Sequence, residues 1–349
     1  MVQKKNKACR SVLLIYTGGT IGMIENPATG ALESFSFEQL LAHAPELKRF
    51  NYHIAAYQFS PPIDSSDMEP SHWIELVEII SSHYALYDGF VVLHGTDTMS
   101  YTASALSFML ENLAKPVILT GSQLPIGLLR TDGKENLITA IEIAAAANLD
   151  GTPIVSEVCI LFENSLMRGN RTTKINTENF DAFRSYNYPI LAHAGVHIKY
   201  ETSLLRKPHP NLTLKPHYRL DTNVVIFTLF PGIREEIVST LFQTSRLRAV
   251  VMKTFGSGNA PQKEWLIKLL EDAKRNNILV VNISQCLIGS VEMERYETGR
   301  QLLSAGVISG YDITPESAIT KLMFLLAQDL PANEIRKRLD SDIAGEITK

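Results

Sequence analysis

The sequence predicts an α/β protein with a larger N-terminal, doubly wound, mainly parallel sheet domain and a smaller C-terminal α/β domain. The first observation behind this prediction is a set of short apolar runs, rich in β-branched residues and each stopped by glycine or polar residues. Such runs are typical of strands that are buried on both faces of a parallel sheet. They lie at residues 12–16, 89–95, 115–121, 157–164, 224–232, 248–256 and 277–284.

The second observation is that helical segments alternate with these runs. Within residues 70–89, the side chains of Trp73, Val77 and Ile80 recur at helical spacing, which indicates an amphipathic helix. Further helices are predicted at 99–115 and 134–147. Strands that alternate with helices along a chain form an open sheet with helices on both faces.

The third observation is a segment from 201 to 222 that contains prolines and basic residues but has little hydrophobic periodicity. Such a composition interrupts regular secondary structure. We therefore predict an N-terminal domain over 1–200, a linker over 201–222 and a C-terminal α/β domain over 223–349.

Composition narrows the classes of function. The chain has 349 residues, 45% hydrophobic and 20% charged, as soluble α/β enzymes have. A net charge of -4 gives no reason to expect a nucleic acid or an anionic membrane as partner. The first apolar run is too short for a secretion signal, and no run is long enough to span a membrane. Because Cys9, Cys159 and Cys286 are far apart and odd in number, we expect neither disulfides nor a zinc site, and a cytoplasmic location.

Polar side chains gather where the apolar runs end. In an open α/β sheet, ligands bind at the carboxyl ends of the strands, so these segments are the candidates for a site. The polar residues there are Thr17, Thr20, His94, Thr96, Asp97, Thr98, Ser122, Gln123 and Lys174, together with Asp64, Ser65, Ser66 and Asp67 in a separate loop.

Each of these features also has a purely structural interpretation. The Gly-Gly turn at 17–20 lacks the spacing of a nucleotide-binding loop and is most often a chain reversal. The residues 64–67 read as a turn whose side chains bond their own backbone. His94 follows an apolar run and suits a hydrogen-bonded wall residue, Lys174 suits a surface charge, and Cys286 suits a small buried hydrophobe.

The combination of these residues points to acyl transfer. A threonine hydroxyl is a weak nucleophile and needs a neighbouring base in a polarised setting. An aspartate and a lysine near a second threonine supply such a base, because a buried lysine can take the hydroxyl proton while the aspartate orients it. Backbone N–H groups of a Gly-Gly turn can bind the oxyanion. This chemistry needs no metal and no cofactor, and the sequence contains no metal-binding motif.

The threonine motifs also carry a resemblance to a known family. The segments "YTGGTIGM" and "HGTDTMSYTASALSFMLENLAKPVILTGSQ" resemble the bacterial-type L-asparaginases, most closely the cytoplasmic type I enzymes. The similarity extends through "RGNRTTK", "GSGNAPQ" and "SAGVISGYDITPESAITKL", hence over nearly the whole chain. It implies hydrolysis of the side-chain amide of L-asparagine to L-aspartate and ammonia through a threonine acyl-enzyme.

The resemblance also assigns roles to particular residues. Thr20 matches the nucleophile, and Thr96, Asp97 and Lys174 match the group that activates the reaction. The residues expected to bind substrate are Asp64, Ser65, Ser66, Thr96, Asp97, Ser122 and Asn259. An amino-acid substrate needs an acceptor for its ammonium group and donors for its carboxylate, and this set offers both.

Two features depart from the family pattern. Many relatives carry a tyrosine in the loop after the first threonine motif, whereas "IENPATGALESF" at 24–35 has none, so Tyr296 becomes the candidate for assisting Thr20. Some type I enzymes also bind asparagine at a regulatory site, where Lys253 here replaces an arginine. An ammonium cannot grip a carboxylate with two parallel bonds as a guanidinium does. The positions that match this site are Thr173, Lys253, Ser284, Gln285 and Cys286.

Two other functions compete with a free asparaginase. The amidase subunit of a tRNA-dependent amidotransferase has an extra N-terminal domain, and a first motif that begins at residue 17 leaves no room for one. A non-catalytic amino-acid sensor on this scaffold should have lost one of Thr20, Thr96, Asp97 and Lys174, yet all are present. The resemblance further implies a homodimer or dimer of dimers, in which the C-terminal domain of one subunit closes the site of its partner.

Overall fold

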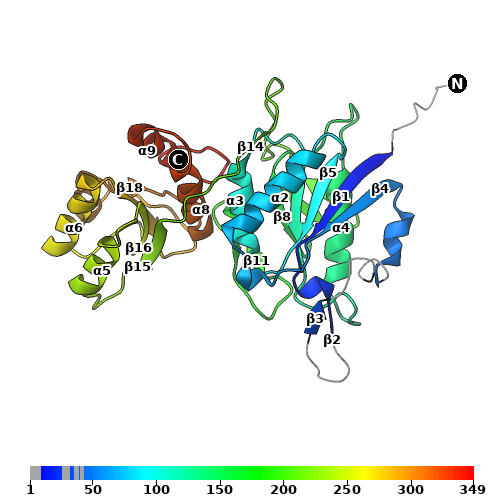
Figure 1. Cartoon of the computed structure of the whole chain (residues 1–349), viewed down its shortest axis with the longest axis horizontal. Helices are drawn as coiled ribbons and strands as arrows, with labels where there is room; N and C mark the ends of the chain where they lie inside the picture. Colours follow the sequence, from blue (N-terminus) through cyan, green and yellow to red (C-terminus); the bar gives the residue numbers. More distant parts are fainter. Residues whose placement is uncertain (1–8, 26–31, 35–38, 40–42) are drawn as a thin grey trace.

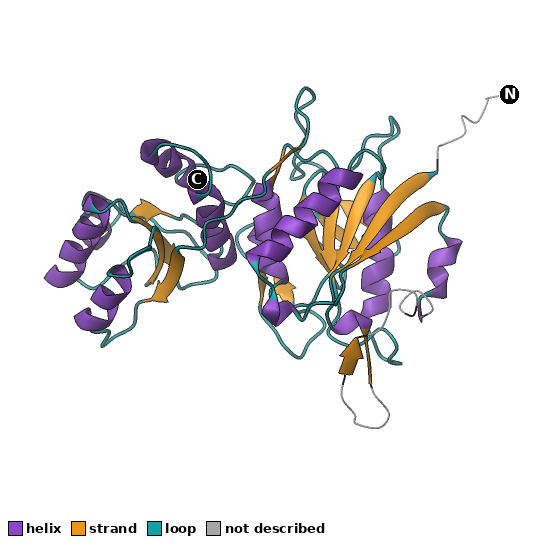
Figure 2. Ribbon diagram, viewed as in Figure 1, coloured by secondary structure: helices purple, strands orange, loops and turns teal. Residues whose placement is uncertain are grey.

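The computed structural model describes residues 9–25, 32–34, 39 and 43–349. Two lobes lie side by side along the long axis of the molecule, the larger one built from the N-terminal part of the chain and the smaller one from the C-terminal part (Figure 1). Each lobe has its own sheet with helices packed on it (Figure 2). This architecture confirms the predicted fold class.

The strands of the described residues are short, and most occupy the predicted apolar runs. They are β1 Arg10–Tyr16, β2 Met23–Glu25, β3 Leu32–Ser34, β4 Tyr52–Gln58, β5 Gly89–Leu93, β6 Leu110–Glu111, β7 Val117–Thr120, β8 Val158–Phe162, β9 Ser165–Arg168, β10 Thr173–Lys174, β11 Phe183–Arg184, β12 Ala192–Ala194, β13 Ile198–Tyr200, β14 Lys215–Pro216, β15 Val224–Thr228, β16 Ala249–Thr254, β17 Leu279–Ser284 and β18 Ile308–Ser309.

Helices lie between most of these strands. The α-helices are α2 Pro70–His83, α3 Met99–Met109, α4 Gly133–Ala145, α5 Glu235–Phe242, α6 Glu264–Arg275, α7 Glu297–Ser304, α8 Pro315–Leu326 and α9 Ala332–Leu339. The short 3₁₀ helices are η1 Thr20–Gly22, η2 Pro45–Arg49, η3 Ser65–Asp67 and η4 Gly169–Arg171.

The large sheet has eight strands in the order β13-β12-β9-β8-β7-β5-β1-β4. The strands β4, β1, β5, β7 and β8 run parallel, whereas β9, β12 and β13 add an antiparallel edge. Tyr16 at the end of β1 is in register with Leu93 at the end of β5, and Leu93 is in register with Thr120 at the end of β7. The loops that follow these three strands therefore leave the sheet side by side.

Apolar side chains cover both faces of this sheet. On β1, Leu13 and Ile15 belong to a core on the side of α2 and α3, while Val12 and Leu14 belong to a second core on the side of α4. Alternate residues of a strand point to opposite faces, so a strand that is buried on both faces must be apolar throughout. This explains why the sequence shows continuous apolar runs instead of alternation.

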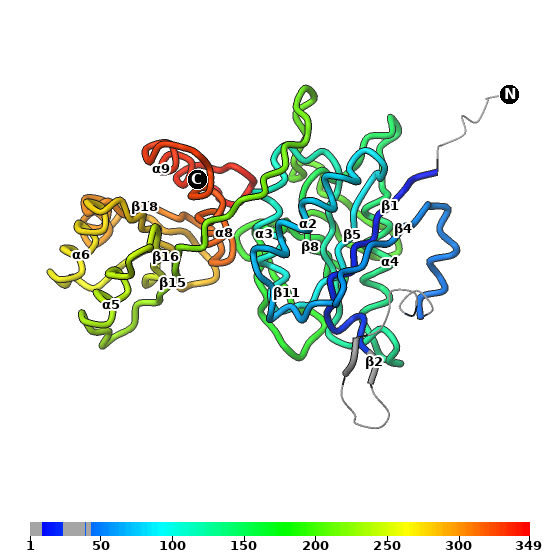
Figure 3. The backbone as a smooth tube through the Cα atoms, in the orientation of Figure 1, coloured from blue at the N-terminus to red at the C-terminus, as the bar shows by residue number. Residues whose placement is uncertain are grey.

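The smaller sheet is parallel, with the strand order β15-β16-β17-β18. The chain reaches it from the large lobe through residues 217–223 between β14 and β15, which we call the crossing segment and which Figure 3 shows. Helix α8 then returns to the junction of the lobes, where the Phe324 ring stacks on Phe108 of α3 with centroids 6.1 Å apart. The core on the α2 and α3 side continues through this contact into β16 and β17.

The structure corrects two expectations about secondary structure. Helix α3 ends at Met109, earlier than the predicted 99–115, and the next two residues pair as β6 with β14 inside the segment predicted as linker. Asn112 then has a left-handed backbone (φ 62°), which a helix does not permit. The segment after β8 is a tight hairpin into the antiparallel strand β9, with a left-handed Glu163 at the turn (φ 54°). Lys174 therefore follows β9 and η4 rather than β8 directly.

No helix within the described ranges is both long enough and apolar enough to cross a membrane.

Candidate active site

The first threonine motif forms a tight loop at the end of β1. Gly18 and Gly19 have φ angles of 134° and 93°, which side chains rarely permit. A Cβ on Gly18 would lie 2.1 Å from the carbonyl oxygen of Ile63, and a Cβ on Gly19 would lie 2.5 Å from Cα of Gly95. The two glycines thus allow this backbone to touch two neighbouring loops, and they deliver Thr20, half-buried, as the first residue of η1.

Two buried hydroxyls hold this loop from beneath. Thr17 donates through Oγ1 to the Leu93 carbonyl at 2.9 Å, which ties the end of β1 to the end of β5. Tyr16 donates its phenol to the Gly22 carbonyl at 3.0 Å, across η1. Burial raises the pKa of Tyr16 to about 12, so this phenol keeps its proton at neutral pH and remains a donor.

The second threonine motif leaves β5 through a buried histidine. His94 Nδ1 lies 2.7 Å from the Gly95 carbonyl, which can only accept, so Nδ1 carries the proton. His94 Nε2 then accepts from the Thr102 hydroxyl at 2.9 Å, and that hydroxyl accepts from Trp73 Nε1 at 2.9 Å. Burial lowers the pKa of His94 to about 4, so the ring is neutral. The interpretation of His94 as a hydrogen-bonded wall residue fits this arrangement.

At the mouth of this loop, Lys174 meets Thr96 and Asp97, from which it is separated by 78 and 77 residues in sequence. Lys174 Nζ lies 2.8 Å from Thr96 Oγ1 and 2.6 Å from Asp97 Oδ1. The Lys174 side chain is 17% exposed and that of Asp97 is 62% exposed, so the lysine is shielded while the carboxylate stays open to a ligand. The interpretation of Lys174 as a simple surface charge does not fit this burial and pairing.

A third loop places polar groups against the two threonine motifs. Asp64 accepts hydrogen bonds from the backbone N–H and the hydroxyl of Ser66, both at 2.9 Å, as predicted for a turn of this composition. Ser65 is buried, and its Oγ would lie 2.4 Å from a Cβ on Gly95, so these two residues are in close contact. Thr98 Oγ1 donates to the Ser65 carbonyl at 2.6 Å and fastens the loop to the start of α3.

The loop after β7 completes the polar edge. Ser122 is buried, and its hydroxyl donates to the Leu124 carbonyl at 2.5 Å. Gln123 Oε1 lies 3.5 Å from Thr96 Oγ1, a distance at which contact is weak. The loop is held by the Asp132 carboxylate, which accepts from the backbone N–H groups of Gln123 and Leu124 at 3.0 to 3.3 Å. Burial raises the pKa of Asp132, against the lowering effect of these N–H donors.

The positions matched to a regulatory site also lie together. They line a small cavity at the junction of the lobes. Thr173 donates to the Glu316 carboxylate at 2.5 Å, and Gln285 donates its side-chain amide to the Leu229 and Lys253 carbonyls at 2.7 and 3.0 Å. Burial raises the pKa of Glu316 despite the hydrogen bond from Thr173. The predicted members of the cavity wall are Thr173, Lys253, Ser284, Gln285 and Cys286.

Cys286 is exposed, so the expectation of a buried small hydrophobe at this position was wrong. It follows Ser284, whose hydroxyl accepts from the Cys286 backbone N–H at 2.9 Å and donates to the Gly256 carbonyl at 2.6 Å. These two hydrogen bonds stabilise a turn after β17, and in this turn the Cys286 thiol is exposed.

Two candidate residues belong to the smaller lobe. Asn259 follows β16, and its side-chain oxygen accepts from the Thr298 hydroxyl at 2.7 Å. Tyr296 precedes α7 with 44% of its surface exposed, and the Arg295 guanidinium lies 5.5 Å from its ring centroid. Neither residue lies in a loop of the large sheet, so the strands of that sheet do not place it beside Lys174. Most of 24–35, the segment without the family's tyrosine, lies outside the described residues.

Sequence reasoning missed two groups next to the site. Asp132 begins α4 and fixes the loop of Gln123, while Glu316 begins α8 and lines an open cavity with Asp97 and Lys174. Asp132 could have been predicted from its place directly before a helix, because aspartate side chains at such positions often bond nearby backbone N–H groups. The residues around Glu316 in the sequence do not predict its role, because its partner Thr173 is 143 residues away.

The mainly parallel sheet, with hydroxyls, a lysine and a carboxylate gathered at the carboxyl ends of its strands, defines an α/β protein with a polar candidate site at the edge of its sheet. Comparison with known proteins specifies the family. Residues 11–206 match the family model "Asparaginase, N-terminal", and residues 223–339 match "Glutaminase/Asparaginase C-terminal domain". The chain therefore belongs to the asparaginase family.

Relatives match over nearly their entire length. The chain is 44% identical to L-asparaginase 1 of Escherichia coli K12 over 344 residues, which cover 97% of this chain and 98% of that protein. L-asparaginase I from Vibrio cholerae has a similar structure, with a TM-score of 0.88, 41% identity and coverage of 98% and 100%. The thermostable L-asparaginase from Thermococcus kodakarensis gives a TM-score of 0.87, with 34% identity and coverage of 97% and 99%.

Proposed function

We propose that this protein is an L-asparaginase, an amidohydrolase that converts L-asparagine to L-aspartate and ammonia. The observation that carries the proposal is the position of Lys174 Nζ, 2.8 Å from Thr96 Oγ1 and 2.6 Å from Asp97 Oδ1. A lysine bonded to both a hydroxyl and a carboxylate is the arrangement that a proton relay for acyl transfer needs. The whole-length similarity to named L-asparaginases supports the same activity.

The proposed mechanism begins with Thr20. Its hydroxyl gives its proton to the group that assists it, and its oxygen attacks the side-chain carbonyl carbon of asparagine, which yields a tetrahedral oxyanion that backbone N–H groups stabilise. The C–N bond then breaks, the leaving nitrogen takes that proton and departs as ammonia, and a β-aspartyl ester remains on Thr20. Water attacks this ester with Thr96 and Lys174 as the proton relay, which releases aspartate and restores the hydroxyl.

The proposed substrate contacts lie on three loops. Asp97 and Asp64 are the candidates for binding the α-ammonium, and the 62% exposure of the Asp97 side chain leaves it accessible. Ser65, Ser66 and Ser122 offer hydroxyls beside them. Charged partners on both ends of an amino acid supply orientation as well as affinity. They favour a free amino acid over a longer amide.

One experiment tests the nucleophile and the activity together. Purified protein is mixed with L-asparagine and ammonia is measured, which also separates an enzyme from a non-catalytic sensor. Thr20→Ala should abolish turnover and leave the fold intact, because it removes only the attacking oxygen. Rapid quenching of the unmodified enzyme and peptide mass spectrometry should find the β-aspartyl adduct on the Thr20 peptide. An adduct on Thr96 instead would exchange the roles of the two threonines.

We further propose that the protein acts as a homodimer or a dimer of dimers. Asn259 and Tyr296, in the smaller lobe, would then complete the site of a neighbouring subunit and assist its Thr20. This proposal rests on the family resemblance and on the lack of a catalytic task for these two polar residues within their own chain. The full substrate-binding set under this proposal is Asp64, Ser65, Ser66, Thr96, Asp97, Ser122 and Asn259.

Regulation by a second asparagine is a further proposal. It is supported by the small cavity at the junction of the lobes and by Thr173, which lines it and directly precedes Lys174. Lys253 there offers a point charge where relatives carry a guanidinium, so we expect weaker binding than an arginine would give. Binding of labelled asparagine to Lys174→Met at two distinct affinities would support the second site; a single affinity would exclude it.

We also propose a cytoplasmic location. The described structure contains no disulfide among Cys9, Cys159 and Cys286, which suits a reducing compartment. Fractionation of cells that produce the protein tests this location directly.

A further inference from the structure

The last residues of the chain return to the large lobe. After α9 the chain runs to the junction of the lobes and turns back, so that the C-terminus lies beside α9 (Figure 3). Residues Ile343–Thr348, which we call the C-terminal segment, contact the 3₁₀ helix η4 of the large lobe. Asn170 of η4 is fully buried and donates its side-chain amide to the Ala344 carbonyl at 2.9 Å.

Arg171 of η4 makes the strongest of these contacts. Its Nε donates to the Gly345 carbonyl at 2.8 Å and its Nη2 donates to the Thr348 hydroxyl at 2.7 Å. Its Nη1 lies 2.9 Å from Asp312, which also accepts from the Thr348 backbone N–H at 2.8 Å. Arg171 is 2% exposed, so its charge and geometry depend on these partners.

The C-terminal segment is itself fixed by a buried ion pair. Glu346 lies 2.6 Å from Lys321 of α8, and both side chains are at most 1% exposed. The Glu346 carboxylate also accepts from the backbone N–H groups of Ile343 and Ala344. The segment thus presents the carbonyls of Ala344 and Gly345 to η4 from a rigid support.

The 3₁₀ helix η4 is one of the supports that position Lys174. Lys174 follows Arg171 by three residues, and the strand β10 that carries it consists of only two residues paired with β11. Besides that pairing, the Thr172 hydroxyl donates to the Arg168 carbonyl at 2.7 Å and the Thr173 hydroxyl donates to the Glu316 carboxylate of α8 at 2.5 Å. On the other side of Lys174, the Ile175 N–H donates to the Ala182 carbonyl at 2.8 Å. Lys174 thus has supports on both sides, and η4, held by the Arg171 contacts, is the support on its N-terminal side.

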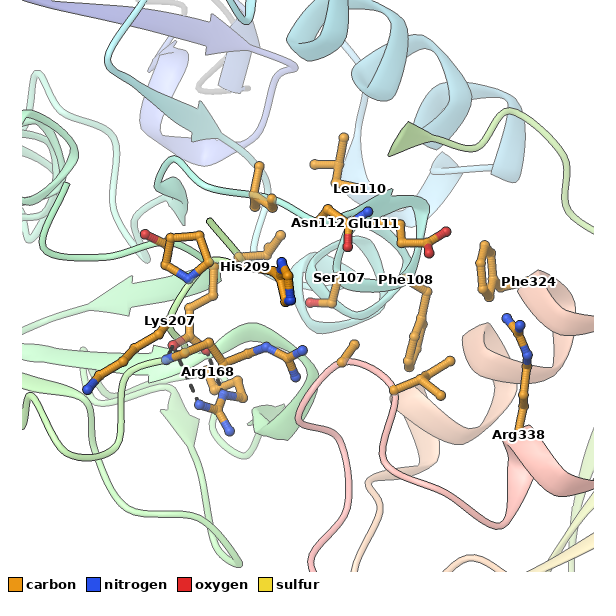
Figure 4. A pocket seen from close by; sticks show the side chains of 18 residues that line it. Ser107, Phe108, Leu110, Glu111, Asn112, Arg168, Lys207, His209, Phe324 and Arg338 are labelled. Atoms are coloured by element: carbon orange, nitrogen blue, oxygen red, sulfur yellow. Dashed lines mark hydrogen bonds and ion pairs between the residues drawn. The ribbon is translucent and has the colours of Figure 1, made fainter. Parts of the chain in front are cut away.

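The other side of the C-terminal segment has room for movement. A cavity of about 370 Å³ is lined by Arg168, Ile343 and Ala344, and Figure 4 shows Arg168 at its edge. Gly345 approaches Arg168 so closely that an added Cβ would lie 2.8 Å from Nη1. The segment is therefore packed tightly against Arg168 at Gly345 and borders open space at Ile343 and Ala344.

We propose that the C-terminal segment is a positioning element for Lys174. Its carbonyls at Ala344 and Gly345 hold η4 through Asn170 and Arg171, and η4 in turn holds the lysine amine against Thr96. The inference rests on the proposed function for its catalytic consequence, whereas the position of the lysine is independent of it. The segment makes no contact with substrate in this scheme.

The test deletes residues 343–349 and measures two quantities. The rate at which the Lys174 amine is reductively methylated, read by peptide mass spectrometry, should rise several-fold as the amine leaves its bonded, shielded position. Lys115 serves as the internal reference, because its ammonium donates to the Tyr84 and Tyr87 carbonyls in the large lobe. For asparagine hydrolysis, kcat should fall by about 10²-fold with KM changed little, since a misplaced base affects chemistry more than binding.

Two point variants keep the test decisive if the deletion unfolds the protein. Arg171→Lys keeps the charge beside Asp312 but cannot reach Gly345 and Thr348 together, so it should show the same two changes to a smaller extent. Lys349→Gln removes an exposed pair with Asp340 and should leave both quantities unchanged.

The two proposals fail differently. Unchanged methylation of Lys174 in Arg171→Lys and in a folded deletion variant would overturn the positioning role, whatever the activity. Methylation that rises equally at Lys174 and Lys115 would also overturn it, because the change would then be general loosening. Absence of ammonia release by the unaltered protein would instead contradict the proposed function, and the methylation rates would still decide the positioning role.

Discussion

Acidification should destabilise this protein through one buried histidine. His94 is 1% exposed, and burial lowers its pKa from 6.5 to about 4. Both ring nitrogens of the neutral imidazole have hydrogen-bond partners, because Nδ1 donates to the Gly95 carbonyl and Nε2 accepts from Thr102. Protonation of Nε2 would turn this acceptor into a donor facing a hydroxyl that already accepts from Trp73.

The sign and the size of the effect follow from proton linkage. Between about pH 6.5 and pH 4, the unfolded chain binds a proton at His94 while the folded protein does not, so the free energy of unfolding falls as the pH falls. The loss begins below 6.5, the ordinary value, and is complete below about 4. Shifting the pH from about 8 to about 5 should remove about 2 kcal/mol through this residue.

Urea unfolding at the two pH values measures this loss, with His94→Asn as the comparison. Asparagine keeps a side-chain amide donor but does not titrate, so the variant should lose about 2 kcal/mol less than the unaltered protein. Burial raises the pKa values of the Asp132 and Glu316 carboxyls, so their protonation contributes stability as the pH falls, and this contribution cancels in the comparison. His193→Asn, on the exposed face of β12, should behave as the unaltered protein does. Equal losses in all three proteins would refute the assignment to His94.

Three further outcomes are expected. Replacing Lys174 with Met should lower kcat by roughly 10²- to 10⁴-fold, the usual contribution of a general base, and steady-state kinetics that stay within a few-fold would make the lysine structural. Gly19→Ala should lower both kcat and the free energy of unfolding, because the Cβ would press on the second threonine motif; Gly151→Ala has a similar φ of 88° with open space around it and controls for backbone strain. Mixing inactive Thr20→Ala with inactive Asn259→Ala under subunit exchange should restore activity if sites are shared, and no recovery despite verified exchange would mean that each site is self-contained.

Much of the fold could be predicted from the sequence because the central strands are buried on both faces. Every residue of β5, β7 and β8 is buried, and nearly all of them are apolar. Short continuous apolar runs of this kind are typical of parallel strands that are covered on both faces. Strand β4 was not predicted, since the edge strand "YHIAAYQ" is only partly buried and carries polar residues. The antiparallel strands β9, β12 and β13 have only three or four residues each, too few for a period to be recognised.

The site could be predicted in its composition but not in its distances. Thr96 and Asp97 are adjacent in sequence, so one motif contains both. The contact from Lys174 spans 78 residues and depends on the hairpin into β9, on η4 and on β10. Only the folded chain determines this path. The hydrogen bond between Thr173 and Glu316 joins the two lobes, and no sequence pattern around either residue predicts it.

The continuous core that crosses the junction of the lobes makes the molecule one cooperative unit. Residues of β1 and α3 share a single apolar cluster with residues of β16 and β17, so neither lobe can lose its structure without exposing part of the other's interior. The crossing segment is therefore not a point at which the chain divides into independently stable halves. Calorimetry should record one melting transition, and a fragment that ends at the segment would leave Phe108 and its neighbours uncovered in water.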